Sequence, residues 1–204
     1  MAIIDYSSLQ SAVAAYLHRD DLTTNIPDFI SLAEARLNRR LRIRAMENRA
    51  TGTSSAGLIA LPTGYREGRS LHISQGGTYR RIDYVTPERA GLYNDSGYTS
   101  AFTVVGSNIE LLPMPTQDVD YRLVYYKALD ALSGTQNWLI LNAPDIYLYA
   151  TLLESAPFIK GDTRIPVWQG MLEQAISDLE AEDRMGAMGG NTVGMVTDNS
   201  VRLG

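Results

Sequence analysis

The spacing of apolar side chains predicts two helices at the start of the chain. Residues 5–18 and 25–44 both place apolar residues three or four positions apart, as an amphipathic helix does. Asp5 or Ser7 can cap the first helix, and Pro27 suits the first turn of the second because its missing N–H is not needed there. The second helix has one apolar face, made of Ile26, Ile30, Ala33, Leu37 and Leu41. These segments predict a helical hairpin.

The pattern changes after Arg44. From there to Lys127, short runs of β-branched or alternating residues are separated by glycine and proline turns. Gln75-Gly76-Gly77 and Gly106-Ser107 each predict the turn of a β-hairpin. Strands are expected at 45–53, 58–61, 69–74, 78–84, 102–105, 108–112 and 121–127, with a turn at 62–65 and a short helix at 86–92. Hairpins joined in this way predict a small antiparallel sheet domain.

Helical spacing returns at Pro144. The segment 144–156 is nearly all apolar, so we expect a buried helix that Pro157 ends or kinks. Asp162 or Thr163 can cap a last helix, which Gly186 is expected to end. Its apolar face consists of Ile165, Trp168, Leu172, Ile176 and Leu179.

These elements predict an α+β fold in which a four-helix bundle carries an inserted small antiparallel β-domain. The bundle would contain residues 1–44 and 138–186, and the β-domain would contain residues 45–137. Residues 187–204 have many glycines and no periodicity, so they predict an extended C-terminal arm. The arm could be a loose terminus, or it could dock on a partner. Its candidate contact residues are Met195, Val196, Val201, Arg202 and Leu203.

Charged residues gather on two of the predicted helices. The basic set near the end of the second helix is Arg36, Arg39, Arg40, Arg42 and Arg44, and the acidic set on the last helix is Glu173, Asp178, Glu180, Glu182 and Asp183. Each set is either a solvated helix face or a surface that meets another chain, because arginine is enriched at interfaces. The two sets could pair between neighbouring copies or within one bundle.

Motifs for catalysis are scarce. The 204 residues contain no cysteine and two separated histidines, His18 and His72, and they lack HExxH, GxSxG and GxxxxGK[ST] sequences. Asp20 and Asp21 could ligate a metal, but in a turn beside Arg19 they are better read as capping or solvated residues. The net charge of −5 argues against a general nucleic-acid binder. With neither a membrane-spanning apolar run nor a signal-peptide pattern, the sequence predicts a non-enzymatic protein of a reducing compartment, without metal or cofactor.

Several phrases resemble the head-to-tail adaptor, or connector, proteins of short-tailed bacteriophages, which include the tail tubular protein A or collar family. The phrases in chain order are Ile26-Pro27-Asp28-Phe29-Ile30, Ala33-Glu34-Ala35-Arg36-Leu37-Asn38-Arg39, Leu61-Pro62-Thr63-Gly64-Tyr65, Leu112-Pro113-Met114-Pro115, Tyr125-Tyr126, Asn137-Trp138-Leu139 and Pro144-Asp145-Ile146-Tyr147-Leu148-Tyr149-Ala150. Their order and spacing, more than any single phrase, carry the resemblance.

The resemblance implies a virion protein of the neck, assembled in the host cytoplasm. It implies a homo-oligomeric ring, expected to be a dodecamer, that binds the portal protein above and the tail nozzle or tail tubular proteins below. Double-stranded DNA would pass through this ring during ejection without sequence-specific binding. The C-terminal arm would reach the portal. No catalytic residues are carried over, and no membrane contact is expected.

Two other functions stay open at this point. The chain could be another virion assembly or head-completion protein that does not form a portal-bound ring. It could also be an enzyme, such as a metal-dependent hydrolase that uses Asp20 and Asp21.

Overall fold

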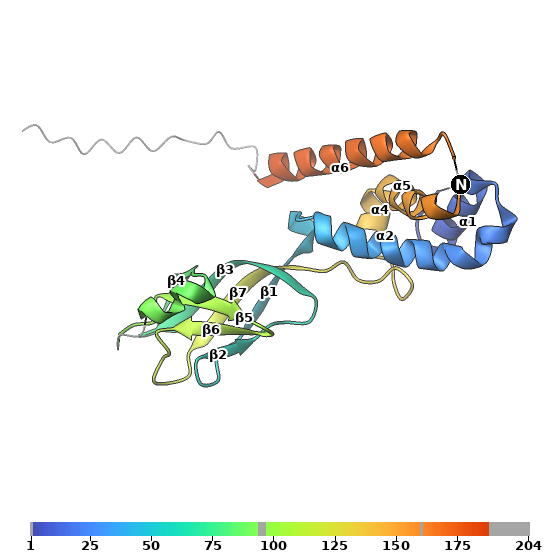
Figure 1. The fold of residues 1–204 in the computed structure, drawn as a ribbon. Helices are drawn as coiled ribbons and strands as arrows, with labels where there is room; N and C mark the ends of the chain where they lie inside the picture. The colour runs from blue at the N-terminus through green and yellow to red at the C-terminus, as the bar shows by residue number, and fades with distance from the viewer. Residues whose placement is uncertain (1, 94–96, 160, 188–204) are drawn as a thin grey trace, which may run out of the picture. The chain divides into compact units, whose positions relative to one another are not determined.

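The computed structural model describes residues 2–93, 97–159 and 161–187 of the chain. Within these residues the chain forms two compact units. The helical unit contains the described residues up to Ala33 and those from Leu139 onward, and the sheet unit contains Glu34–Trp138. Figure 1 shows coiled helices in the first and one large sheet in the second. None of the described helices combines the length and the apolar character that a bilayer crossing requires.

The predicted terminal helices are confirmed, with shifted ends. The α-helices are α1 (Tyr6–Leu17), α2 (Ile26–Arg40), α3 (Pro87–Ala90), α4 (Trp138–Asn142), α5 (Pro144–Glu154) and α6 (Ile165–Ala187). Asp5 caps α1, since its carboxylate accepts the backbone N–H of Ser8 at 2.7 Å. The second helix ends at Arg40 instead of Arg44, and α6 runs through Gly186, so that glycine does not end it.

In the helical unit, α5 packs against both α1 and α6. Its predicted burial is confirmed, because Ile146, Tyr147 and Leu152 are inaccessible to solvent. From α6, the predicted residues Trp168, Leu172, Ile176 and Leu179 are also buried. The first part of α2 contributes Phe29, whose ring lies 5.0 Å from that of Phe158 in the short 3-10 helix Ala156–Phe158. Apolar burial therefore holds this unit together.

The sheet unit contains one seven-stranded sheet in the order β1-β7-β3-β4-β5-β6-β2. Its strands are β1 (Glu47–Thr53), β2 (Leu58–Ala60), β3 (Tyr65–Gln75), β4 (Thr78–Tyr84), β5 (Ala101–Val105), β6 (Asn108–Leu112) and β7 (Asp120–Lys127). The two predicted hairpins, β3–β4 and β5–β6, are confirmed. The sheet curves into a nearly closed, barrel-like form around one apolar core. Leu71, Ile73, Ile109 and Leu123 are fully buried there.

The predicted turn at 62–65 is also confirmed. The N–H of Tyr65 donates to the carbonyl of Pro62 at 3.0 Å, and Gly64 has a φ of +75°, a conformation that favours glycine. The carbonyl of Gly64 accepts the N–H of Ala128 at 2.7 Å. The turn therefore places the start of β3 beside the end of β7.

The predicted antiparallel sheet is wrong in one respect, because β4 and β5 are parallel. They pair only through Asp83–Ala101 and Tyr84–Phe102. Between them, the chain passes through α3 and the 3-10 helix Gly91–Tyr93, which gives it the length to return in the same direction. The sequence contains hairpin turns on either side of this crossover but no signal for its direction.

The predicted four-helix bundle with a small inserted β-domain is also wrong. The described chain has six α-helices and a large mixed sheet instead. The physical reason lies in α2. Its residues from Glu34 onward belong to the sheet unit, so only the first part of this helix can pack in a helical bundle. The predicted arm at 187–204 lies outside the described residues, except for Ala187, which belongs to α6.

Candidate interaction surfaces

The basic set predicted around the end of α2 contains exposed arginines and also Arg42, which has contacts inside the chain. Arg36, Arg39 and Arg40 lie exposed on α2, whereas Arg42 and Arg44 follow its end. Arg42 serves the fold, since its Nε donates to Glu67 Oε2 at 3.0 Å in β3. Its Nη1 donates to the Leu41 carbonyl at 2.6 Å and to the Asn38 carbonyl at 3.2 Å. Arg42 therefore caps the carboxyl end of α2 and joins it to the sheet.

The acidic set on α6 is divided by the helix geometry. Asp183 is half-buried, while the other four acidic residues are exposed. With 3.6 residues per turn, Asp178 and Glu182 share a stripe with the exposed Val167 and Met171. Glu173 and Glu180 lie on the other flank. We call Val167, Met171, Asp178 and Glu182 the outer stripe of α6.

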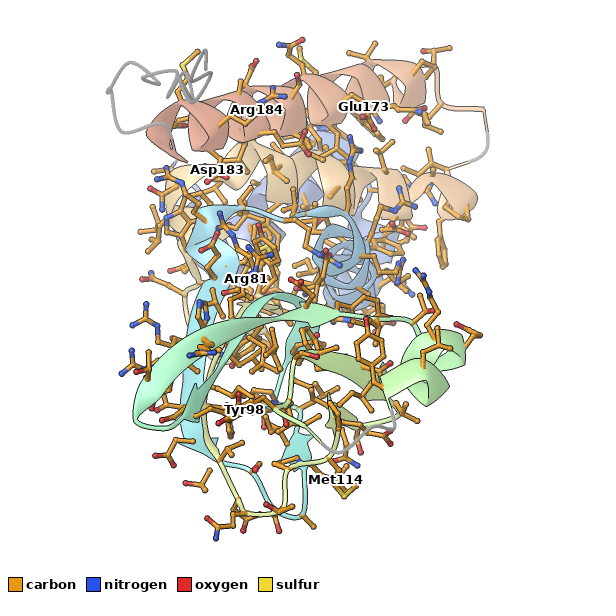
Figure 2. The ribbon with its side chains drawn as sticks, turned by 90° about the vertical axis from the view of Figure 1, so that its left-hand side faces the viewer. Arg81, Tyr98, Met114, Glu173, Asp183 and Arg184 are labelled. Atoms are coloured by element: carbon orange, nitrogen blue, oxygen red, sulfur yellow. The ribbon has the colours of Figure 1, made fainter. Side chains whose placement is uncertain are left out.

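A second basic surface, absent from our sequence prediction, lies on the outer face of β1, β7, β3 and β4. Arg122 of β7 lies opposite His72 of β3, which lies opposite Arg81 of β4, so the three form a row across neighbouring strands. Arg49 of β1 pairs with Val124, two residues further along β7. Since Leu71 and Leu123 point into the core, these alternate residues must point outward. Figure 2 marks Arg81 on the sheet.

The arginines of this face are available for an external anion. No carboxylate among the described residues pairs with Arg49, Arg81 or Arg122. The Arg122 guanidinium lies 3.7 Å from the centroid of the Tyr79 ring, which fixes its orientation through a cation–π contact. We call Arg49, His72, Tyr79, Arg81 and Arg122 the basic sheet face. Arg49, Arg81 and Arg122 each lie in a predicted strand, but nothing in the sequence pairs those strands, so only the register revealed this face.

The loops at one end of the sheet expose large apolar side chains. Tyr98 is 80% exposed and Met114 is 63% exposed, and Figure 2 shows both at the loop end of the sheet unit. Thr99 donates to the Pro113 carbonyl at 2.8 Å, which ties the two loops together. An open groove beside them is lined by residues that include Gln75, Tyr98 and Thr116. Exposed apolar residues of this size are typical of protein–protein contact sites.

Two acceptors on α2 hold the segment that follows β7, residues 128–137. Glu34 Oε1 accepts the N–H of Leu132 at 2.7 Å, and Asn38 Oδ1 accepts the N–H of Leu129 at 2.7 Å. Within the segment, Asn137 donates to the Asp130 carbonyl at 2.8 Å. Lys127 donates to Asp130 at 2.9 Å, and this hydrogen bond raises the pKa of the lysine. Side-chain hydrogen bonds, rather than pairing with a strand, therefore hold residues 128–137 in place.

Arg164 has a similar role at the start of α6. Its Nη1 donates to the Tyr16 carbonyl at the end of α1 at 2.8 Å, and its guanidinium lies 5.0 Å from the Trp168 ring. Nη2 donates to Asp162 Oδ2 at 2.7 Å. Side-chain hydrogen bonds from Arg164 lower the pKa of the Asp162 carboxyl, helped by the backbone N–H of Arg164. The predicted role of Asp162 at this helix start agrees with these contacts.

The residues considered for catalysis show ordinary structural roles where the structure describes them. Asp21 accepts two hydrogen bonds from Arg19, each 2.6 Å long, and these lower the pKa of its carboxyl. The described part of the chain contains no group of three or more His, Asp and Glu side chains that could hold a metal ion. The predicted arm contacts at Met195, Val196, Val201, Arg202 and Leu203 lie outside the described residues.

Comparison with protein families shows a match over nearly the whole chain. The family model described as SU10 adaptor protein matches residues 4–194, whereas no curated protein matches. The predicted resemblance is thereby confirmed at the level of a bacteriophage adaptor family. Such an adaptor is a virion component that binds other head or tail proteins and has a structural, non-enzymatic role. The chain belongs to the SU10 adaptor protein family.

Proposed function

We propose that this protein is a head-to-tail adaptor that forms a ring beneath the portal of a short-tailed phage. The observation that carries the proposal is the family match over residues 4–194. In this role the protein corresponds to the tail tubular protein A or collar proteins, and twelve copies are expected. The ring joins the portal protein above to the tail nozzle or tail tubular protein below, and it assembles in the host cytoplasm.

The surfaces described above support such a role. A closed ring needs contact between two different patches on each copy, because identical patches would give only a dimer. The two predicted patches are the arginines near the end of α2, Arg36, Arg39, Arg40, Arg42 and Arg44, and the acidic residues of α6, Glu173, Asp178, Glu180, Glu182 and Asp183. Arg42 is already used within its own chain, so Arg39 is the better candidate for an external contact. The exposed Tyr98 and Met114 would suit an axial partner.

The arm and the channel complete the proposal. Residues 187–204 dock on the portal through their apolar residues, by adding a strand to it. The bore passes duplex DNA without gripping it, which suits a chain whose net charge is −5. Measurable affinity of the assembled ring for duplex DNA at physiological salt would contradict this part of the proposal.

The decisive experiment mixes purified protein with portal rings from the same phage and images the products by electron microscopy. Three forms are compared: the full chain, a truncation after Gly186, and a full-length variant with Met195, Val196, Val201 and Leu203 changed to serine. We expect an added ring with the full chain only. An added ring with all three forms would keep the adaptor function but would move the portal contact away from the arm. No added ring with any form would refute the portal-bound ring and favour another virion assembly role.

A further inference from the structure

We propose that the basic sheet face of one copy binds the outer stripe of α6 in a neighbouring copy. The inference rests on the proposed ring and assigns the two surfaces that build it. It differs from the pairing suggested by the sequence, because the basic partner is the sheet instead of the end of α2. Of the acidic set, it uses only Asp178 and Glu182.

The charge of the two units supports an attraction between copies. Residues 34–138 contain 13 Lys and Arg against 10 Asp and Glu, which gives a net charge of +3. The rest of the chain contains 5 Lys and Arg against 13 Asp and Glu, which gives −8. Because the opposite charges lie on different units, the sheet unit of one copy attracts the helical unit of the next. Such complementarity steers association and sets its orientation.

The spacing of the charged residues also fits. Asp178 and Glu182 are four residues apart on α6, so they are separated by roughly 6 Å along its axis. Arg49 and Arg122 occupy diagonal positions on paired strands, which places them roughly 7–8 Å apart. Arg81 lies two strands from Arg122, at roughly 10 Å. Two carboxylates on one helix can therefore face two or three guanidinium groups at once.

Both surfaces also have apolar area to bury. On α6, Val167 is 58% exposed and Met171 is 48% exposed. On the sheet, Tyr79 and Val124 are half-buried among the arginines, and the Tyr79 ring already holds Arg122 in place. An arginine oriented in advance loses less freedom on binding than a mobile one. Apolar burial would provide most of the affinity, and the charges would fix the register.

A protein partner suits this face better than nucleic acid. Asp83 lies exposed on the outward-facing side of β4, two residues from Arg81. Asp120 begins β7, two residues before Arg122. These carboxylates would repel the continuous negative charge of a phosphate backbone. A protein surface, in contrast, can place apolar or basic residues opposite them and acidic residues opposite the arginines. Covering the face with a neighbour would also remove this basic surface from contact with DNA, in agreement with a bore that does not grip the duplex.

The test uses two charge-reversed variants of the full chain. The sheet variant carries Arg81→Glu and Arg122→Glu, and the helix variant carries Asp178→Lys and Glu182→Lys. Matched controls are Arg89→Glu, an exposed arginine in α3 of the same unit, and Glu180→Lys, on the other flank of α6. Circular dichroism and thermal melting establish that each variant is folded. The number of copies bound per portal ring is then measured against concentration by mass photometry.

We expect the sheet variant alone and the helix variant alone to need a roughly tenfold or higher concentration for half-occupancy, because like charges then meet at every contact. An equimolar mixture of the two should recover the wild-type occupancy. In a ring where the variants alternate, the acidic sheet face meets the basic α6, and the unchanged sheet face meets the unchanged α6, so every contact is attractive. Both controls should behave like the wild type. Recovery in the mixture, when neither variant recovers alone, would establish the contact between copies.

Other outcomes would overturn the inference in distinguishable ways. Wild-type occupancy for both single-face variants would refute these surfaces while leaving the adaptor function intact. Recovery in a chain that carries all four substitutions, but not in the mixture, would indicate pairing within one copy. Loss of binding to a duplex oligonucleotide by the sheet variant, with occupancy unchanged, would assign the face to DNA. If even the wild type does not bind portal rings, the proposed function itself fails.

Discussion

The contact between Asn38 and the segment after β7 gives the sharpest prediction about stability. The side chain of Asn38 is 7% exposed, and its oxygen accepts the N–H of Leu129 at 2.7 Å, 91 residues away in the sequence. Asn38→Leu keeps the approximate size of the side chain but removes the acceptor. A part-buried N–H that loses its acceptor costs about 1–3 kcal/mol. We therefore expect residues 128–137 to open more readily.

Hydrogen exchange at single amides measures this opening directly. An energy of 1–3 kcal/mol corresponds to an exchange rate about 5 to 150 times faster at the Leu129 amide. Asn38→Asp provides the matched comparison, because it keeps an oxygen acceptor and should keep this amide protected. Arg39→Leu places the same new side chain at the next, exposed position of α2 and should leave the exchange rate unchanged.

The Leu132 amide tests whether the segment moves as a whole. Its N–H donates to Glu34, one turn before Asn38 on α2, so opening of the whole segment would also speed its exchange in Asn38→Leu. Faster exchange at Leu129 alone would indicate local fraying. An unchanged rate at both amides in Asn38→Leu would refute the reasoning, because the hydrogen bond would then contribute nothing to holding the segment.

Three further substitutions test the packing and the ion pairs. Leu37→Ala removes a side chain that is 1% exposed and should lower the free energy of unfolding by about 2–5 kcal/mol in urea, so an unchanged melting temperature would show that this face of α2 is not packed. Arg42→Ala breaks the contact with Glu67 and uncaps α2, so we expect a loss of about 1 kcal/mol, against almost none for Arg39→Ala. Because Arg164 lowers the pKa of Asp162, the pair stabilises the protein above the ordinary aspartate pKa of about 3.9, and this contribution disappears as the pH falls through the lowered value. The melting temperature of Asp162→Asn should therefore lie below that of the wild type at pH 7 and approach it towards pH 2, and a gap that persists at pH 2 would contradict this origin.

Local patterns in the sequence predicted local structure well. The cap at Asp5, the turn at Gly64 and both hairpins follow from residues that are close together in the chain, so single-sequence reasoning could identify them. The apolar period of α6 likewise predicted its buried residues. In these cases one physical requirement, such as a free N–H that needs an acceptor or a positive φ, restricts the residue type at a single position.

The errors concern relations between distant residues. The pairings of β1 with β7 and of β2 with β6 depend on the closure of the sheet, and no local turn specifies them. The same limit applies to the basic sheet face, because Arg81 and Arg122 share it only through the register of three strands. The role of Arg42 was also hidden, since its partner Glu67 is 25 residues away. The family resemblance, by contrast, needed only the order of several short phrases.

The short pairing between β4 and β5 has a consequence for the temperature dependence of the sheet. Only two residue pairs join the halves β1-β7-β3-β4 and β5-β6-β2 along the backbone, whereas β1 and β7 pair over seven. The halves are held mainly by the shared core, in which Leu71 and Ile82 lie with Phe102 and Ile109. Attraction between apolar groups weakens on cooling. On cooling, the junction between β4 and β5 should therefore lose more stability than any other part of the sheet. The long strand pairings on either side depend more on backbone hydrogen bonds and should be less affected.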